Sequence, residues 1–200
     1  MMVEQNFITG GDGAILLTKI NDVPTNYQED TDSVNYLIQS CATSKDALCR
    51  LYQMFKSSVF AVAFSITCDY HLSEDCVAET FVRLTQVKRF SPKDGDGRGF
   101  IHAVARNVAL EQRRRYKKEC RSFVIQSYGE ADKTVEDSIF LNQMLKYLSD
   151  KQRQIVVLRC CSELSFKEIA SIMKCPETTA KSRYKKAISI LQSKAGEGNE

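Results

Sequence analysis

The stretch SFKEIASIMKCPETTAKSRYKKAISIL, residues 165–191, contains two amphipathic segments on either side of a short turn. In each segment the apolar side chains repeat at intervals of three and four residues, which is the spacing of one face of a helix. The expected buried faces are Phe166, Ile169, Ala170 and Met173 in the first segment and Ala180, Tyr184, Ala187, Ile188 and Leu191 in the second. The first segment ends three residues before Pro176, so the stretch predicts a helix-turn-helix.

The remaining face of the second helix is basic and rich in hydroxyl groups. In a helix-turn-helix that binds DNA, the second helix lies in the major groove, where lysine and arginine supply charge and threonine and serine supply hydroxyl contacts. The alternative is an ordinary solvated surface helix. The candidate DNA contacts of this unit are Lys167, Thr178, Thr179, Lys181, Ser182, Arg183, Lys185 and Lys186.

Glycine and proline divide the rest of the chain into long helical blocks. The nine glycines fall in four places and the three prolines lie between periodic segments, which predicts an all-α protein. The first block, from about Ser33 to Lys118, has three apolar helix faces that can close a core, and residues 89–100 are too rich in glycine and aspartate to be helical. The predicted faces are Ala47, Leu48, Leu51, Tyr52, Phe55, Val59, Val62, Ala63 and Ile66; then Val77, Phe81, Leu84 and Val87; then Ile101, Val104, Ala105, Val108 and Ala109.

These patterns predict two small helical domains joined by a flexible linker. The predicted boundaries are an acidic and disordered N-terminal extension at 1–32, a first domain at 33–118, a linker at 119–134, a second domain at 135–193 and a tail at 194–200. In the second domain, Ser149 with Gln152 and Ser165 with Glu168 have the spacing of capping boxes, which open helices.

A second basic surface lies on the last predicted helix of the first domain. Residues 98–121 contain eight basic side chains against Glu111 and Glu119, and the basic positions oppose the apolar stripe. Cations are favourable at the C-terminal end of any helix, but three consecutive arginines at 113–115 exceed that need. We therefore predict a nucleic-acid contact here.

The composition is that of a globular protein, with 43% hydrophobic and 26% charged residues, and no apolar run approaches the ~20 residues of a membrane helix. The net charge is +3, with an acidic first 32 residues and a basic remainder, which suggests a polyanionic partner. The eight cysteines show no C-x-x-C spacing, so we expect buried thiols rather than a disulfide framework. Cys68, His71 and Cys76 lack an evident fourth ligand, so no metal site is predicted.

Two basic surfaces on two helical domains resemble one family, the bacterial sigma factors of the extracytoplasmic-function (ECF) type. SEDCVAETFVRL, residues 73–84, resembles the polymerase-binding helix of that family, and GFIHAVARNVALEQRRR, residues 99–115, resembles the helix that meets the minus-ten promoter element. The domain that reads the minus-thirty-five element is similar to LSDKQRQIVVLRCCSELSFKEIASIMKCPETTAKSRYKKA, residues 148–187. The resemblance covers roughly residues 47–191 and rests on the order and spacing of the three motifs.

The resemblance implies a non-catalytic specificity subunit that binds core RNA polymerase, recognises both promoter elements and initiates transcription of a specific gene set. The domains would be a sigma region 2-like bundle and a sigma region 4-like helix-turn-helix. The implied partners are core RNA polymerase, promoter DNA and an anti-sigma factor, in the cytoplasm and without membrane insertion. The resemblance implies no cofactor.

The implied site residues follow the motifs. Contacts with core polymerase would come from Asp75, Glu79, Phe81, Arg83 and Leu84. The loop at 90–99 would receive an unstacked base of the non-template strand, at a cost that stacking groups and donors must offset. The implied minus-ten contacts are Phe90, Lys93, Arg98, Phe100, His102, Arg106, Asn107, Arg113, Arg114, Arg115 and Lys117.

The chain departs from the family pattern at Ala78, Phe100, Glu111 and Lys174, where glutamine, tryptophan, aspartate and the turn glycine are common. If the turn needs a positive φ at Lys174, the lysine costs roughly 1 kcal/mol. The acidic extension has an alternative role, in which it folds over a basic surface and restrains DNA binding.

Three other classes of protein remain as alternatives. A helix-turn-helix regulator would bind duplex DNA without polymerase and would use the first block for dimerisation or effector binding. An enzyme is disfavoured, because the chain has only two histidines, no phosphate-cradling glycine motif and no nucleophile with an obvious base. A protein-interaction scaffold would not need six cations on one helix.

Overall fold

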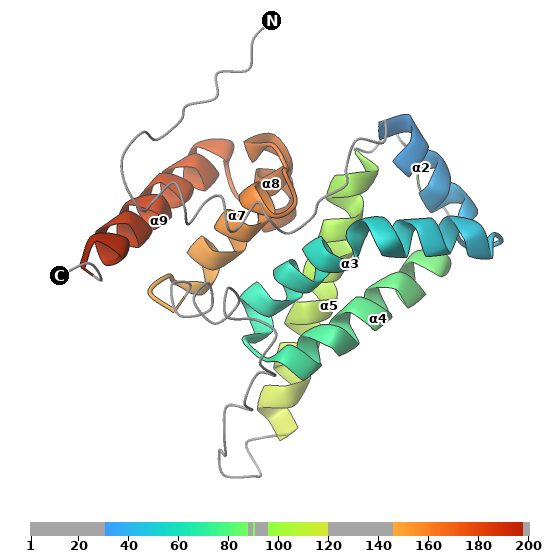
Figure 1. Cartoon of the computed structure of the whole chain (residues 1–200), viewed down its shortest axis with the longest axis horizontal. Coiled ribbons are helices and arrows are strands. Elements are labelled where there is room, and N and C mark those ends of the chain that lie inside the picture. The colour runs from blue at the N-terminus through green and yellow to red at the C-terminus, as the bar shows by residue number, and fades with distance from the viewer. Residues whose placement is uncertain (1–30, 88–89, 91–95, 120–145, 198–200) are drawn as a thin grey trace, which may run out of the picture.

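The described part of the computed structural model comprises residues 31–87, 90, 96–119 and 146–197, and every regular element in it is a helix (Figure 1). The predicted all-α class is confirmed. The helices are α2 (Thr31–Ser40), α3 (Lys45–Thr67), α4 (Tyr70–Thr85), α5 (Gly97–Glu119), α7 (Asp150–Cys160), α8 (Phe166–Met173) and α9 (Glu177–Glu197). Nearly all of the predicted N-terminal extension and of the linker lies outside the described residues.

The long helix α3 is the centre of the first domain, where it packs against α2, α4 and α5. The side chain of Ser44 opens it by accepting a hydrogen bond from the backbone N–H of Ala47 at 3.2 Å. Its predicted apolar face is buried except at two positions: Leu48 is partly buried, and Tyr52 is 43% exposed and meets the ring of Phe81 edge-on. α4 ends at Thr85, two residues before the last position of its predicted face.

The loop that precedes α5 is shorter than predicted, because the helix begins at Gly97 and not after Phe100. Asp96 starts it: its side chain accepts from the N–H of Arg98 at 3.0 Å and its carbonyl accepts from the N–H of Phe100. α2 passes so close to Gly97 that this position of the first turn has no room for a side chain. A Cβ at Gly97 would lie 2.7 Å from both Asn35 Oδ1 and Ile38 Cδ1.

Helix α2 was not predicted as a separate element. It buries side chains at intervals of three and four residues against the first domain, and the N–H of Gly97 donates to Asn35 Oδ1 at 3.0 Å. The buried apolar positions are Val34, Leu37 and Ile38, followed by Cys41 just after the helix.

The second domain confirms the predicted helix-turn-helix. Both capping boxes form, with the N–H of Ser149 donating to Gln152 Oε1 at 3.0 Å and the N–H of Ser165 donating to Glu168 Oε2 at 2.7 Å. Between α8 and α9, Lys174 has φ 50° and ψ 53°, and the N–H of Cys175 donates to the carbonyl of Ala170. This six-to-one bond after a left-handed residue is a Schellman motif. Lys174 therefore occupies the left-handed backbone that its glycine-like position implied.

The two domains pack directly against each other. α7 lies beside α3 and α8 contacts α5, so that one hydrophobic cluster runs through both domains (Figure 1). Among the described helices, none combines the length and the apolar character that crossing a membrane requires.

Candidate nucleic-acid interface

The outer face of α9 gathers the candidate DNA contacts of the helix-turn-helix. α8 and α9 bury Ile169, Met173, Ala180, Ala187 and Leu191 against each other and α7, which turns the opposite side of α9 outward. Thr179 and Arg183 are half-buried at its edge, and Lys181 pairs with Glu177 at 2.6 Å. The exposed candidates are Lys167, Thr178, Lys181, Ser182, Lys185 and Lys186.

The aromatic side chain of Tyr184 holds α9 on the rest of the unit. Its ring meets Phe166 edge-on with centroids 5.4 Å apart, and the guanidinium of Arg159 lies 5.3 Å above the ring of Phe166. Burial raises the pKa of Tyr184 above its ordinary value, so this phenol stays neutral. Its role is packing, which leaves the neighbouring basic residues at the surface.

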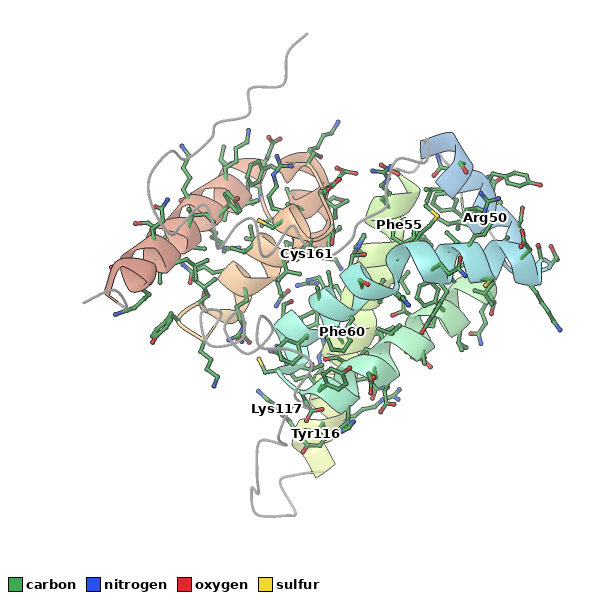
Figure 2. The ribbon with its side chains drawn as sticks, in the orientation of Figure 1. Arg50, Phe55, Phe60, Tyr116, Lys117 and Cys161 are labelled. Carbon is green, nitrogen blue, oxygen red and sulfur yellow. The ribbon has the colours of Figure 1, made fainter. Side chains whose placement is uncertain are left out.

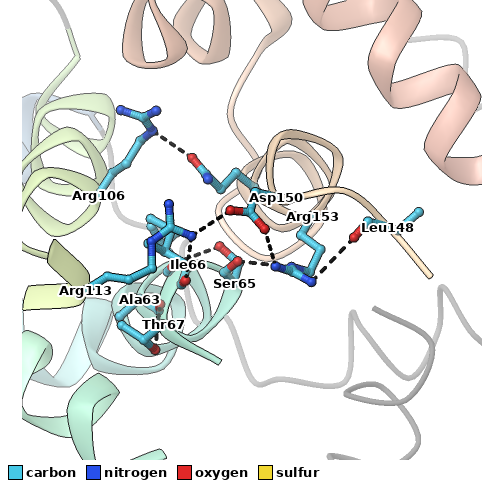
Figure 3. A network of polar contacts seen from close by, with 11 residues as sticks. Ala63, Ser65, Ile66, Thr67, Arg106, Arg113, Leu148, Asp150 and Arg153 are labelled. Atoms are coloured by element: carbon cyan, nitrogen blue, oxygen red, sulfur yellow. Dashed lines mark hydrogen bonds and ion pairs between the residues drawn. The ribbon is translucent and has the colours of Figure 1, made fainter. Parts of the chain in front are cut away.

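The basic surface of α5 divides into two sets. Asn107, Arg114, Arg115 and Lys117 are exposed, and Lys117 is labelled in Figure 2. Arg106 and Arg113 are only partly exposed, since they face the second domain (Figure 3). Arg106 Nε donates to Gln154 Oε1 at 2.9 Å, and Arg113 Nη1 donates to Asp150 Oδ2 at 2.7 Å. The geometry therefore brings all the predicted arginines to one helix but covers two of them.

His102, near the start of α5, is buried and not at the surface as predicted. His102 is 1% exposed, its Nδ1 lies 2.7 Å from the carbonyl oxygen of Arg98, and its Nε2 lies 3.0 Å from Ser58 Oγ. Burial lowers the pKa of His102 to about 4, so the imidazole is neutral. A neutral core histidine cannot serve as the surface contact with DNA that we expected, and it is not retained.

Two aromatic residues remain at the end of the first domain where a base could stack. The rings of Phe90 and Phe100 lie 5.0 Å apart, and both are partly buried. Arg98 lies in the first turn of α5 beside them and is also partly buried. Lys93 lies outside the described residues.

The candidate polymerase surface on α4 also needs correction. Phe81 is 5% exposed and Leu84 is fully buried, so both belong to the core and cannot face a partner. Asp75 is exposed and Glu79 half-exposed on the outer side of α4. Val82, which the sequence reasoning missed, is 50% exposed on that side.

The side chain of Arg83, which we expected to contact polymerase, instead links α4 to α5. Its Nε donates to Glu79 Oε1 and its Nη2 to Glu111 Oε2, both at 2.7 Å. The hydrogen bond from Arg83 is the main cause that lowers the pKa of Glu111. Glu111, one of the departures from the family pattern, therefore connects α5 to α4 through Arg83.

Within the described ranges, no group of three or more histidine, cysteine, aspartate or glutamate side chains could hold a metal ion. Cys76 is buried and His71 lies 3.9 Å from Glu74. Every cysteine in these ranges is a free thiol, and burial raises the pKa of Cys76 to about 11 and that of Cys161 to about 12. Such thiols stay protonated and unreactive.

Two family models match the chain: sigma-70 region 2 over residues 51–119 and sigma-70, region 4 over residues 141–191. The ECF RNA polymerase sigma factor SigM of Bacillus subtilis (strain 168) is 30% identical over 139 residues, which are 66% of this chain and 85% of that protein. The ECF RNA polymerase sigma factor BldN of Streptomyces coelicolor (strain ATCC BAA-471 / A3(2) / M145) is 25% identical, over 75% of this chain and 61% of that protein.

Solved structures share the fold. CnrH in complex with the cytosolic domain of CnrY matches with a TM-score of 0.64 and 18% identity, over 84% of this chain and all of that chain. The sigma factor RpoE in complex with the anti-sigma factor NepR from Bartonella quintana matches with a TM-score of 0.58 and 22% identity, over 75% of this chain and 96% of that chain.

Proposed function

The chain belongs to the family of ECF RNA polymerase sigma factors, and we propose that it is an alternative sigma factor that gives core RNA polymerase its promoter specificity. The observation that carries this proposal is the order of three surfaces along the chain. An acidic and apolar surface lies on α4, one basic surface lies on α5, and a second lies on the outer face of α9. A regulator that only binds duplex DNA needs the last of these alone.

The three surfaces have distinct roles in this proposal. Asp75, Glu79 and Val82 on α4 bind core polymerase. The exposed cations of α5 neutralise phosphates at the minus-ten element, and Phe90 and Phe100 stack on an unpaired base. The outer face of α9 enters the major groove at the minus-thirty-five element.

We also propose the partners and the compartment. Core polymerase and promoter DNA bind the chain in the cytoplasm, and the chain itself carries out no catalytic step. An anti-sigma factor is a further proposed partner, since one solved relative was determined with the anti-sigma factor NepR.

The decisive experiment is transcription in vitro with purified core polymerase, this protein and a library of upstream fragments. Starts that appear only when the protein is added support the sigma role, whereas shifts of particular duplexes by the protein alone, without starts, support a regulator. Replacing Arg114 and Arg115 with alanine should reduce those starts at least tenfold. Lys45→Ala, which removes an exposed cation at the start of α3, is the matched control and should leave them unchanged.

A further inference from the structure

The guanidinium of Arg83 is held between two carboxylates from different parts of the chain. Its Nη2 lies 2.7 Å from Glu111 Oε2 on α5, and its Nε lies 2.7 Å from Glu79 Oε1, one turn earlier on α4. The hydrogen bonds to Glu111 and to Glu79 raise the pKa of this guanidinium above its ordinary value. Charge-assisted hydrogen bonds at two nitrogens of one planar group fix its orientation. Glu79 therefore holds Arg83 in the position from which it reaches Glu111.

Glu111 lies next to two exposed cations on its own helix. It precedes Arg114 by three residues and Arg115 by four, and residues at these spacings are neighbours on a helix surface. A glutamate four residues before a cation also has the more favourable order for an ion pair within a helix. Both arginines are exposed, and 40% of the Glu111 side chain is exposed. Glu111 is therefore placed to pair with either arginine.

The carboxylate of Glu111 is nevertheless paired from outside its helix. In the described part of α5, it forms no ion pair with Arg114 or Arg115 and accepts from Arg83 instead. The hydrogen bond from Arg83 is the largest cause that lowers the pKa of Glu111, and the charges of Arg115 and Arg114 act in the same direction. Three cations thus attract one carboxylate, and the one on α4 binds it.

The choice of partner matters for DNA binding. An arginine that is paired with a glutamate must give up that partner before it can bind a phosphate. Its charge is already neutralised, so binding also releases fewer counterions from the DNA, and counterion release supplies much of the affinity. The pairing of Glu111 with Arg83 avoids this loss at both neighbouring arginines.

We propose that Arg83 is a positioning residue for DNA binding, which holds the carboxylate of Glu111 away from the exposed cations of α5. Arg114 and Arg115 then bind phosphates of the minus-ten element. The proposal rests on the proposed function and deepens it, because it gives Arg83 a part in promoter binding although Arg83 itself touches no DNA.

The test is a double-mutant cycle of Arg83→Met, Glu111→Gln and the variant with both changes. Holoenzymes are purified by gel filtration, so that every complex contains the variant, and are titrated with a fluorescent fork DNA carrying the minus-ten region of a promoter found by transcription. Arg83→Met should weaken binding about fivefold at about 0.1 M salt, which is roughly the effect of one lost phosphate contact. Glu111→Gln should change little by itself, but it should restore the affinity of Arg83→Met to within about twofold of the unmodified chain.

Two simpler roles of Arg83 give different cycles. If Arg83 acts only through its long-range charge, Glu111→Gln should tighten binding by the same factor with and without Arg83. If the ion pair only holds α4 against α5, Glu111→Gln should weaken binding as Arg83→Met does, and the combined variant should not recover. Either result overturns the proposal.

The salt dependence of binding is a readout that a merely structural role would not move. The slope of log affinity against log salt should become shallower by about one in Arg83→Met and should return in the combined variant. Lys56→Met is the matched control, since it removes one exposed cation from α3 and should leave the slope unchanged. Circular dichroism checks that each variant is folded, and Arg83→Gln takes the place of Arg83→Met in the cycle if that variant is not.

Failure of the proposed function is a separate outcome. Absence of polymerase-dependent starts with the unmodified chain refutes the sigma role. The same cycle, measured on the full chain alone with a fork of random sequence at low salt, still decides whether Arg83 keeps Glu111 away from the two cations.

Discussion

A single imidazole inside the first domain makes its stability depend on pH. His102 has a pKa of about 4 in the folded chain, against 6.5 for an ordinary histidine. The unfolded state therefore binds more protons below pH 6.5, so the free energy of unfolding falls as the pH drops from about 6.5 to about 4, and the loss approaches about 3 kcal/mol. Urea unfolding of the unmodified chain and of His102→Gln across this range measures it. Equal pH dependence in the two proteins would contradict the prediction.

The left-handed residue between α8 and α9 gives a prediction at one backbone position. Lys174 has φ 50°, which a side chain makes costly and glycine adopts freely. Lys174→Gly should raise the free energy of unfolding by about 0.5–1 kcal/mol, after the greater freedom of glycine in the unfolded chain is subtracted. Lys174→Ala keeps the strain and should give no gain. Denaturant titrations of the three proteins distinguish the backbone effect from the loss of the lysine charge.

At the scale of elements, the contact between α2 and α5 depends on one glycine of a closely spaced pair. A Cβ at Gly97 would lie 2.7 Å from Asn35 Oδ1, which already accepts from the N–H of Gly97, whereas a Cβ at Gly99 would meet nothing closer than Glu168 Oε1 at 3.7 Å. Gly97→Ala should therefore destabilise the chain by about 1–3 kcal/mol as α2 is displaced. Gly99→Ala should be neutral or stabilise it by up to about 1 kcal/mol. Thermal melts of the pair test this, and equal melting temperatures would contradict it.

The sequence predicted the helices whose signals are local. The faces of α3 and α5, both capping boxes and the helix-turn-helix were confirmed, because a period of 3.6 residues and a cap each lie within a few positions of chain. α2 has the same period over ten residues and could have been found from it. The start of α5 could not be predicted from local sequence, since the N–H of Gly97 donates to the side chain of Asn35, which lies 62 residues away in the chain.

The errors in the site arose where residues were assigned from a motif without asking whether they lie on the buried or the exposed face of the helix. Phe81 and Leu84 follow Val77 at four and seven residues, so the periodicity that predicted them as core was in conflict with their assignment to a polymerase contact. His102 lies four residues after Arg98 and three before the buried Ala105, on the inner side of α5. The partners of Arg106 and Arg113 come from another domain, so no local pattern predicts that these two residues are covered.

For the whole molecule, the ion pairs of Asp150 with Arg113 and Arg153 make the shape of the free protein sensitive to salt. These ion pairs are partly exposed, and raising the ionic strength from about 50 mM to about 500 mM shortens the screening length from about 14 Å to about 4 Å. The radius of gyration of the unmodified chain should rise over this range. Arg153→Met should have a larger radius at low salt and respond less. A radius that stays constant in the unmodified chain would show that the packed apolar residues alone hold the domains together.

The position of Arg113 has a consequence for genetics. Its guanidinium joins the carbonyl of Ile66 and the carboxylate of Asp150, so its replacement disturbs the packing of the two domains whatever else the side chain binds. A screen that scores transcription output therefore mixes two effects at Arg113, and the exposed Arg114 and Arg115 are better positions for isolating a DNA contact. Replacements at Asp150 and Arg153 break the same contact from α7, so they should reproduce the structural part of an Arg113 phenotype.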